Sequence, residues 1–332
     1  MARSNRPLLR TLATLCLLLP ALWAVAALSI DAAWAPWPGL ACALLMTGLL
    51  AWLRPFRYAL AGCGLIVIGV IAWWLHLAPG SERDWQADVT RPPRATLDGH
   101  MLTIENVRNF RYHGADDTDS EQHWETRRYD LSKIIGLDIY LSSWGPQHIA
   151  HTIMSWRFAD GPPLAISIET RKERGESYSA VLGFFRQYEL YYVVADERDV
   201  IGVRTGHRGE TIRLYAIAGR RDGARRLLMG YIKDINALAA QPRWYNAFTT
   251  NCTTVIFDNV QHVFGVSKLW DWRVYANAHL PEMLYEEGFV DTTMPYAELQ
   301  QRSDITAAAQ AADGADDFST RIRANLPVAT MR

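Results

Sequence analysis

One cysteine in the polar part of the chain stands where a helix is predicted to begin. Cys252 follows the tripeptide TTN, whose residue types cap helix N-termini, and it precedes apolar residues at helical spacing. A thiol in the first helical turn lies beside the positive end of the helix dipole, which favours the thiolate and lowers its pKa. The backbone N–H groups of Cys252 and Thr253 are the predicted donors to an oxyanion. The alternative is a small buried thiol that only fills space.

A nucleophilic cysteine needs a general base, and His151 is the best placed of the nine histidines. It opens the first strand of a predicted hairpin, residues 151–158 and 164–170, joined by a Gly/Pro turn. The partner strand carries Ser167 and Glu169, and either side chain could orient the imidazole across the ladder. The sequence leaves the choice between them open. For any single histidine, the alternative is a structural or surface role.

Metal and nucleotide chemistry have little support in the sequence. His148 and His151 are three residues apart, but they lie on either side of a predicted loop-to-strand junction, and no third ligand follows at metal spacing. The motifs HExxH, GxGxxG, Walker A and GxSxG do not occur. We therefore expect no metal ion, no cofactor and no nucleotide.

The overall composition restricts the class of protein further. The chain has 332 residues and a net charge of −1, so it lacks the strong positive charge that is typical of nucleic-acid binding. Cys16, Cys42 and Cys63 lie in apolar runs, and only Cys252 lies in the polar part. This pattern excludes a disulfide scaffold.

Three apolar runs near the start, at about 11–30, 38–53 and 58–78, predict transmembrane helices. A cleaved signal peptide is the alternative for the first run. Basic residues lie before the first run and between the second and third: Arg3, Arg6, Arg10, Arg54 and Arg57. The positive-inside rule then places the N-terminus in the cytoplasm and everything after residue 79 outside. We expect a multi-pass protein of a bacterial inner membrane with a periplasmic C-terminal domain.

The predicted organisation has four parts. Residues 1–79 form the transmembrane region, 80–100 a linker, 101–300 an α+β domain, and 301–332 a mobile tail rich in Ala and Asp. Within the domain we predict strands at 101–112, 133–144, 151–158, 164–170, 190–196 and 211–218, helices at 178–190, 224–239 and 251–264, and a loop at 113–125.

A run that mixes basic and aromatic residues, 169–205, is a possible substrate surface. Its arginines could bind an anionic head group, although local ion pairs on a solvated face explain them equally well. The predicted substrate-binding residues are Arg171, Arg186, Tyr188, Trp244, Tyr245 and Asn251.

Several of these segments, in this order, resemble one bacterial family. HTIMSW, SIETRKERGESYS with GFFRQYEL, DERDVIGVRT and PRWYNAFTTNCTT are similar to the Lnb N-terminal periplasmic domain over roughly 142–264. That family resembles the circularly permuted papain-like proteins, including the NlpC/P60 and lecithin:retinol acyltransferase groups, in which the histidine strand precedes the cysteine helix. The resemblance implies that Cys252 is the nucleophile, His151 the base and Glu169 the third member.

The resemblance also implies a fold and an activity. The expected fold is α+β, with three N-terminal transmembrane helices followed by a circularly permuted papain-like (NlpC/P60-type) periplasmic domain. The expected activity is a cysteine-dependent acyl transfer from phospholipid, through a Cys252 thioester, to an amine such as the N-terminus of a diacylated lipoprotein. The expected partners are thus membrane lipids and a lipoprotein. The alternatives are an amidase or endopeptidase acting on cell-wall peptides, and a non-catalytic envelope protein.

Overall fold

The computed structural model describes residues 6–80, 83–113, 120–145, 148–264 and 271–327. The chain divides into two compact units. The first comprises Met1–Ser81 together with two later segments, Tyr178–Glu189 and Trp244–Ala247. The second comprises Glu82–Ser177, Leu190–Arg243 and Phe248–Arg332. The boundary therefore differs from the predicted one near residue 79, because two segments of the predicted periplasmic domain belong to the helical unit.

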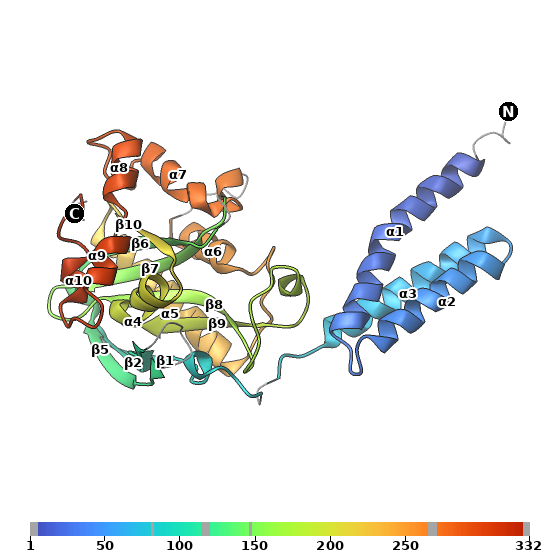
Figure 1. Cartoon of the computed structure of the whole chain (residues 1–332), viewed down its shortest axis with the longest axis horizontal. Helices are drawn as coiled ribbons and strands as arrows, with labels where there is room; N and C mark the ends of the chain where they lie inside the picture. Colours follow the sequence, from blue (N-terminus) through green and yellow to red (C-terminus); the bar gives the residue numbers. More distant parts are fainter. Residues whose placement is uncertain (1–5, 81–82, 114–119, 146–147, 265–270, 328–332) are drawn as a thin grey trace. The chain divides into compact units, whose positions relative to one another are not determined.

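The first unit is built on helices α1 (Arg6–Ile30), α2 (Trp37–Trp52) and α3 (Phe56–His76), drawn in blue in Figure 1. Within the described residues, only α3 is both long and apolar enough to cross a membrane. The shorter apolar stretches Thr14–Ile30 and Trp37–Trp52 fall below that length. The predicted N-terminal helices are therefore present, whereas three membrane crossings remain a prediction.

Small residues let the helices of the first unit approach closely. Ala24, Ala27, Cys42 and Cys63 are buried where the three helices meet. A Cβ on Gly39 would lie 1.8 Å from Ser29 Oγ, so only glycine fits at this contact between α2 and α1.

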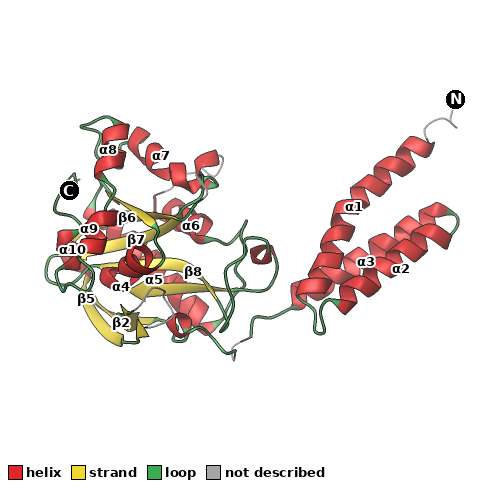
Figure 2. Ribbon diagram, viewed as in Figure 1, coloured by secondary structure: helices red, strands yellow, loops and turns green. Residues whose placement is uncertain are grey.

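The second unit contains an eight-stranded sheet (Figure 2). The strand order is β1-β2-β9-β8-β7-β6-β10, and β5 pairs with β2 off this path. The strands that carry the candidate site, β6 to β8, are consecutive and antiparallel, whereas β2 and β9 pair in parallel. The strands are β1 (Arg94–Asp98), β2 (Met101–Arg108), β5 (Trp124–Asp130), β6 (Ile134–Ser143), β7 (His151–Phe158), β8 (Leu164–Arg171), β9 (Glu189–Ala195) and β10 (Thr211–Ala216).

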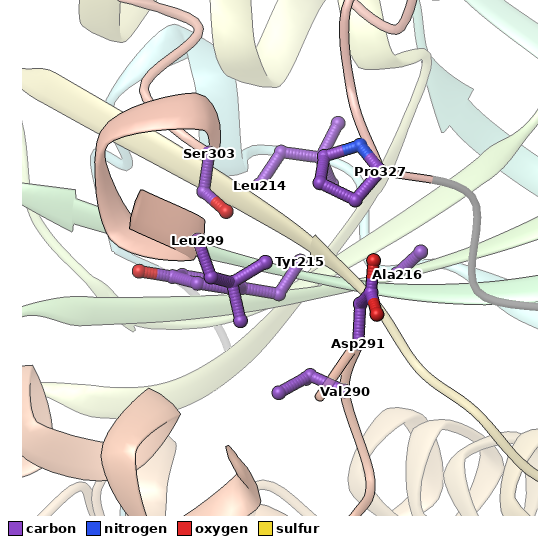
Figure 3. Close-up of a pocket in the computed structure, with 8 residues that line it drawn as sticks. All are labelled: Leu214, Tyr215, Ala216, Val290, Asp291, Leu299, Ser303 and Pro327. Atoms are coloured by element: carbon purple, nitrogen blue, oxygen red, sulfur yellow. The ribbon is translucent and has the colours of Figure 1, made fainter. Parts of the chain in front are cut away.

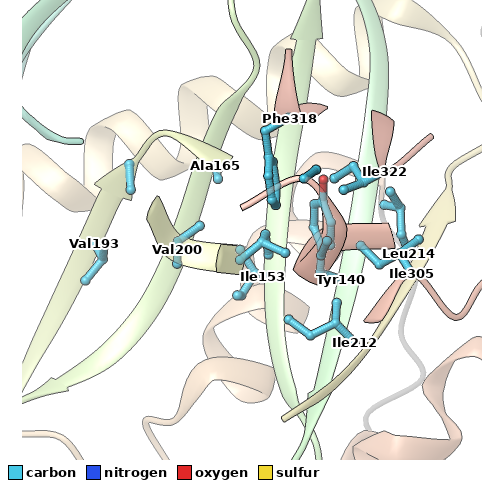
Figure 4. Close-up of a cluster of buried hydrophobic side chains, with 14 of the residues drawn as sticks. Tyr140, Ile153, Ala165, Val193, Val200, Ile212, Leu214, Ile305, Phe318 and Ile322 are labelled. Carbon is cyan, nitrogen blue, oxygen red and sulfur yellow. The ribbon is translucent and has the colours of Figure 1, made fainter. Parts of the chain in front are cut away.

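Helices cover both faces of this sheet. Ile153 and Trp156 are an odd number of residues apart on β7, so their side chains point to opposite faces. Ile153 packs with Val200, Phe318 and other buried side chains of the cluster in Figure 4. Trp156 donates its indole N–H to Ala224 O on the other face, at 2.8 Å. The helices are α4 (Glu197–Gly202), α5 (Arg221–Ala240), α6 (Cys252–Phe264), α7 (Leu280–Glu286), α8 (Tyr296–Arg302), α9 (Thr306–Ala311) and α10 (Phe318–Arg321).

The structure changes several predicted elements. Residues 178–190 do not form one helix: a short 3-10 turn, Leu182–Phe184, is followed by β9. All seven residues of β9 are buried, so the strand reads as a continuous apolar run rather than an alternating one. The predicted linker contains β1, and the predicted loop 113–125 contains β4 (Ser120–Glu121) and the start of β5. Residues 114–119 of that loop lie outside the described residues.

The predicted mobile tail is also wrong, because residues 301–327 pack onto the sheet. Ala309, Phe318 and Ile322 are buried in the cluster of Figure 4. Arg323 donates to the buried carboxylates of Asp138 (2.7 Å) and Glu197 (2.5 Å). The Ala/Asp-rich composition of this segment predicts mobility, but a few large apolar side chains and Arg323 fix it to the core.

Replacing Arg323 therefore tests whether this segment holds the fold. Arg323→Ala removes the Arg323 cation from two buried carboxylates, of which Asp138 retains its pair with Arg157, and we expect a loss of about 3 to 5 kcal/mol in the free energy of unfolding. Arg321→Ala is the matched control, because Arg321 forms an exposed pair with Asp317 in the same segment; we expect it to cost under about 0.5 kcal/mol. Urea unfolding followed by tryptophan fluorescence measures both, and equal effects would contradict the anchoring role of Arg323.

Candidate active site

The N-terminus of α6 presents the thiol of Cys252. Asn251 caps the helix: its Oδ1 accepts the backbone N–H of Thr253 at 2.9 Å and that of Thr254 at 3.0 Å. In return, the Asn251 N–H donates to Thr254 Oγ1 at 2.9 Å. The helix therefore begins at Cys252, as the sequence predicts, and this residue is half-buried.

This cap corrects one prediction about the oxyanion donors. The N–H of Thr253 is already bonded to Asn251 Oδ1, so it is not available to a substrate oxygen. Asn251 uses its Oδ1 as the helix cap, and its role in binding substrate stays a prediction. The oxyanion role of the Cys252 N–H also stays a prediction; the first N–H groups of a helix have no acceptor within it.

His151 opens β7 and is buried, with 8% of its surface exposed. Its Nε2 lies 2.6 Å from Ser167 Oγ and 3.0 Å from Glu169 Oε1. Ser167 Oγ in turn donates to the same carboxylate oxygen at 2.7 Å. The register pairs Ile153 with Ser167, so its continuation sets His151 opposite Glu169. Both residues between which the sequence left the choice open, Ser167 and Glu169, therefore contact the same imidazole nitrogen.

Cys252 and His151 are hydrogen-bonded to each other, and we assign this bond to Nδ1 because Nε2 contacts Ser167 and Glu169. Burial disfavours the charged form of each group, but the charge of each group stabilises the opposite charge of the other. The Glu169 carboxylate and the Cys252 sulfur raise the pKa of His151 to about 9. His151, the Thr152 backbone N–H and the Thr253 hydroxyl lower the pKa of Cys252. Each shift favours the charged form, so the pair is biased toward a thiolate and an imidazolium.

A buried arginine, which the sequence analysis did not single out, completes the site. Arg204 Nη2 donates to Glu169 Oε1 at 2.6 Å, and its Nη1 donates to Glu210 Oε2 at 3.0 Å. Ser142 Oγ donates to the same Glu210 oxygen. Burial alone would raise the pKa of Glu169, but His151 and Arg204 hold it well below its usual range. Arg204 belongs to the motif DERDVIGVRT and lies in a π-helical turn, Val203–His207. Such turns are common at functional sites.

Arg171, one of the predicted substrate ligands, has a structural role instead. Its guanidinium lies 4.2 Å from the Trp85 ring and 5.3 Å from the Tyr191 ring. It also donates to the carbonyls of Val89 and Thr90. These contacts attach the segment before β1 to two strands of the sheet, β8 and β9.

The remaining predicted ligands belong to the first unit. Arg186 and Trp244 both donate to Leu77 O, at 2.6 and 2.9 Å. Tyr188 and Tyr245 are buried, and the Tyr245 N–H donates to Tyr188 O at 2.9 Å. Their described contacts make them structural residues of that unit. A direct role at the thiol therefore has no support from these contacts.

Two hollows among the described residues of the second unit are lined by neither Cys252 nor His151. The pocket of Figure 3, lined by Leu214, Ser303 and Pro327 among others, has a volume of about 10 Å³, room for roughly one water molecule. A cavity of about 300 Å³ lies beside Ser143, Arg213 and His279.

The histidine pair suggested for a metal is not assembled. His148 Nδ1 lies 2.9 Å from His279 Nε2 instead of joining His151. Among the residues that the structure describes, no three His, Cys, Asp or Glu side chains converge as metal ligands do.

The ionised pair predicts how fast the thiol reacts at acidic pH. An unperturbed cysteine is roughly 0.3% ionised at pH 6, whereas the lowered pKa of Cys252 gives a much larger thiolate fraction. We expect His151→Ala to slow iodoacetamide labelling of Cys252 at pH 6 by at least about tenfold, since each pKa unit is a factor of ten. Peptide mass spectrometry separates Cys252 from the other cysteines. His123→Ala, at an exposed histidine paired with Glu125, is the control; equal labelling of both variants would contradict the ion pair.

Comparison with known proteins agrees with the sequence resemblance. The model of the Lnb N-terminal periplasmic domain family matches residues 120–281, which include Cys252, His151, Glu169 and Arg204. No curated protein and no solved structure matches the chain. The family's description makes the matched region a periplasmic domain of an envelope protein, while the multi-pass topology remains a prediction. The chain therefore carries an Lnb N-terminal periplasmic domain over residues 120–281, as its sequence motifs indicated.

Proposed function

We propose that this protein is a cysteine acyltransferase of the bacterial envelope. The observation that carries the proposal is the thiol of Cys252 at a helix N-terminus, hydrogen-bonded to a buried imidazole that Glu169 keeps protonated. A thiolate beside an imidazolium is an activated nucleophile with its own proton donor. The apolar helix α3, which is long enough to cross a bilayer, supports a lipid as acyl donor.

In the first half-reaction, the Cys252 thiolate attacks the ester carbonyl of a phospholipid. The carbonyl oxygen becomes an oxyanion, and the backbone N–H of Cys252 is its donor. Collapse of the tetrahedral intermediate breaks the ester C–O bond. The His151 imidazolium gives its Nδ1 proton to the departing lysophospholipid oxygen, leaving a thioester on Cys252 and a neutral imidazole.

In the second half-reaction, a neutral amine attacks the thioester carbonyl. His151 takes the proton from the attacking nitrogen, an amide forms, and the thiolate leaves. The enzyme returns to the thiolate–imidazolium pair with which it began. We propose the N-terminal amine of a diacylated lipoprotein as the acceptor, because both substrates then reside in the same membrane.

The direct test is acyl transfer in phospholipid vesicles. The wild-type chain, incubated with a diacylated lipoprotein, is expected to add one acyl chain to it by mass spectrometry. Cys252→Ala is expected to lower the rate at least about 1000-fold because the thioester cannot form. Cys16→Ala, at an exposed cysteine of α1, is the matched control and should transfer normally.

The same experiment separates the alternatives. Release of free fatty acid, or cleavage of a cell-wall peptide, by wild type but not by Cys252→Ala would make the protein a hydrolase and contradict transfer. Absence of every reaction in wild type would reject the catalytic proposal.

The pKa of each member sets the pH range in which the site works. Transfer is expected to rise through the lowered pKa of Cys252 and to fall as His151 loses its proton near its pKa of about 9. Glu169 raises the pKa of His151, so Glu169→Gln moves the alkaline limit to lower pH. At neutral pH we expect a loss of roughly 10- to 100-fold.

A matched substitution controls for the loss of a carboxylate elsewhere. Glu298 forms an exposed pair with Arg302, so Glu298→Gln should leave both limits unchanged. A Glu169→Gln enzyme with the wild-type pH–rate profile would contradict the role given to this carboxylate.

A further inference from the structure

One buried amide touches both chain segments that carry the reacting groups. Asn277 lies in the short turn Asn277–His279, between the Trp272–Val274 turn and α7, and 4% of its surface is exposed. Its side chain reaches Ala150, which precedes His151, and Thr253, which follows Cys252. The chain therefore uses a third segment to hold the nucleophile and the base together.

On the histidine side, the amide pairs with the backbone of Ala150 in both directions. The Ala150 N–H donates to Asn277 Oδ1 at 2.7 Å, and Asn277 Nδ2 donates to Ala150 O at 2.5 Å. These two bonds continue the hydrogen bonding of β7 beyond its first residue. They fix the backbone from which the His151 side chain projects.

On the cysteine side, the second Nδ2 proton goes to Thr253 Oγ1 at 2.7 Å. Thr253 is buried, with 4% of its surface exposed, and its Oγ1 lies 3.8 Å from Cys252 Sγ. Because Oγ1 accepts from Asn277, its own proton is free to point at the sulfur. A flipped amide would place its oxygen against Ala150 O and its NH₂ against the Ala150 N–H, so the three contacts agree on one orientation.

We infer that Asn277 is a positioning residue that holds the His151 strand and the Cys252 helix in register and turns the Thr253 hydroxyl toward the sulfur. The inference deepens the proposed function, since it rests on Cys252 acting as a nucleophile. Asn277 touches no reacting atom, so its effect is carried by Ala150 and Thr253.

The groups that face the thiol define what a substitution changes. His151 faces it from β7, the Thr152 N–H from the same strand, Thr253 from α6 and Tyr231 from α5. Burial keeps the pKa of Tyr231 well above its usual value, so this ring stays neutral. A change in the acid limb of thiol reactivity therefore reports on His151 and on the Thr253 hydroxyl.

The test is the rate of iodoacetamide labelling of Cys252 from pH 5 to 10, in the full chain solubilised in detergent. In Asn277→Ala we expect labelling at pH 6 to fall at least about tenfold, while the rate at pH 10 stays within about threefold of wild type. Asn277→Asp should lose more at pH 6, because a carboxylate accepts the Thr253 proton and adds a negative charge near the sulfur. Asn259→Ala is the matched control: it removes another buried amide, on α6 itself, that bonds Asp234 and Val255 O.

A milder pair of variants keeps the test decisive if Asn277→Ala does not fold. Thr253→Val removes only the hydroxyl, and we expect labelling at pH 6 to fall about threefold. Thr253→Ser restores the hydroxyl and should restore the rate. An unchanged acid limb in Asn277→Ala, in Asn277→Asp or in Thr253→Val would overturn the inference, and so would an equal shift in Asn259→Ala.

The outcome is independent of the acyl donor, because no substrate is present during labelling. Loss of acid labelling in Asn277→Ala alongside absent acyl transfer in wild type would reject the acyltransferase and retain the positioning role. Normal acyl transfer in wild type, with an unshifted labelling profile in Asn277→Ala, would retain the acyltransferase and reject the positioning role.

Discussion

The negative charge of Glu169 is the feature on which the candidate site depends. It raises the pKa of His151, and the imidazolium in turn lowers the pKa of the Cys252 thiol. A carboxylate among buried groups is costly unless it is paired, and here His151, Ser167 and Arg204 all point at one oxygen. Arg204 opposes this effect because its positive charge lowers the pKa of His151. The carboxylate of Glu210 also pairs with Arg204 and partly offsets that charge. The site is therefore a balance of five charged groups and not an isolated dyad.

The fold supplies what this balance needs, namely short distances between groups on rigid elements. The hairpin of β7 and β8 fixes His151 opposite Glu169, and the π-helical turn after α4 brings Arg204 to the same carboxylate. The cap at Asn251 starts α6 at the thiol itself. His151 is buried, while Cys252 as a whole residue is half-buried. The base is thus screened from water.

The sequence was most informative where local patterns decide the structure. The Thr-Thr-Asn cap, the Gly/Pro hairpin and the order of histidine strand and cysteine helix correctly predicted the elements around Cys252 and His151. It was least informative where distant segments meet. Arg204 reads as one more charge in a charged run, and only the folded sheet brings it to Glu169. Residues 301–327 read as a mobile tail because alanine and aspartate dominate, whereas the burial of Phe318 and Ile322 decides their position. Such contacts depend on tertiary packing, which overrides local composition.

A single carboxylate shows why the helical unit is more than an anchor. Asp31, at the end of α1, is the only charged side chain between Thr11 and Leu53. Its oxygens accept from Trp74 Nε1 at 2.7 Å, from Gln187 Nε2 at 2.7 Å and from the Arg186 backbone N–H at 3.1 Å. Two of these donors lie more than 150 residues later in the sequence, as the separations of 155 and 156 show. Because a carboxylate in apolar surroundings needs such partners, the first unit is complete only when the segment Tyr178–Glu189 has folded onto it. The helices and the periplasmic domain therefore cannot be exchanged as independent modules, and a cut at the end of α3 would leave Asp31 without two of its three donors.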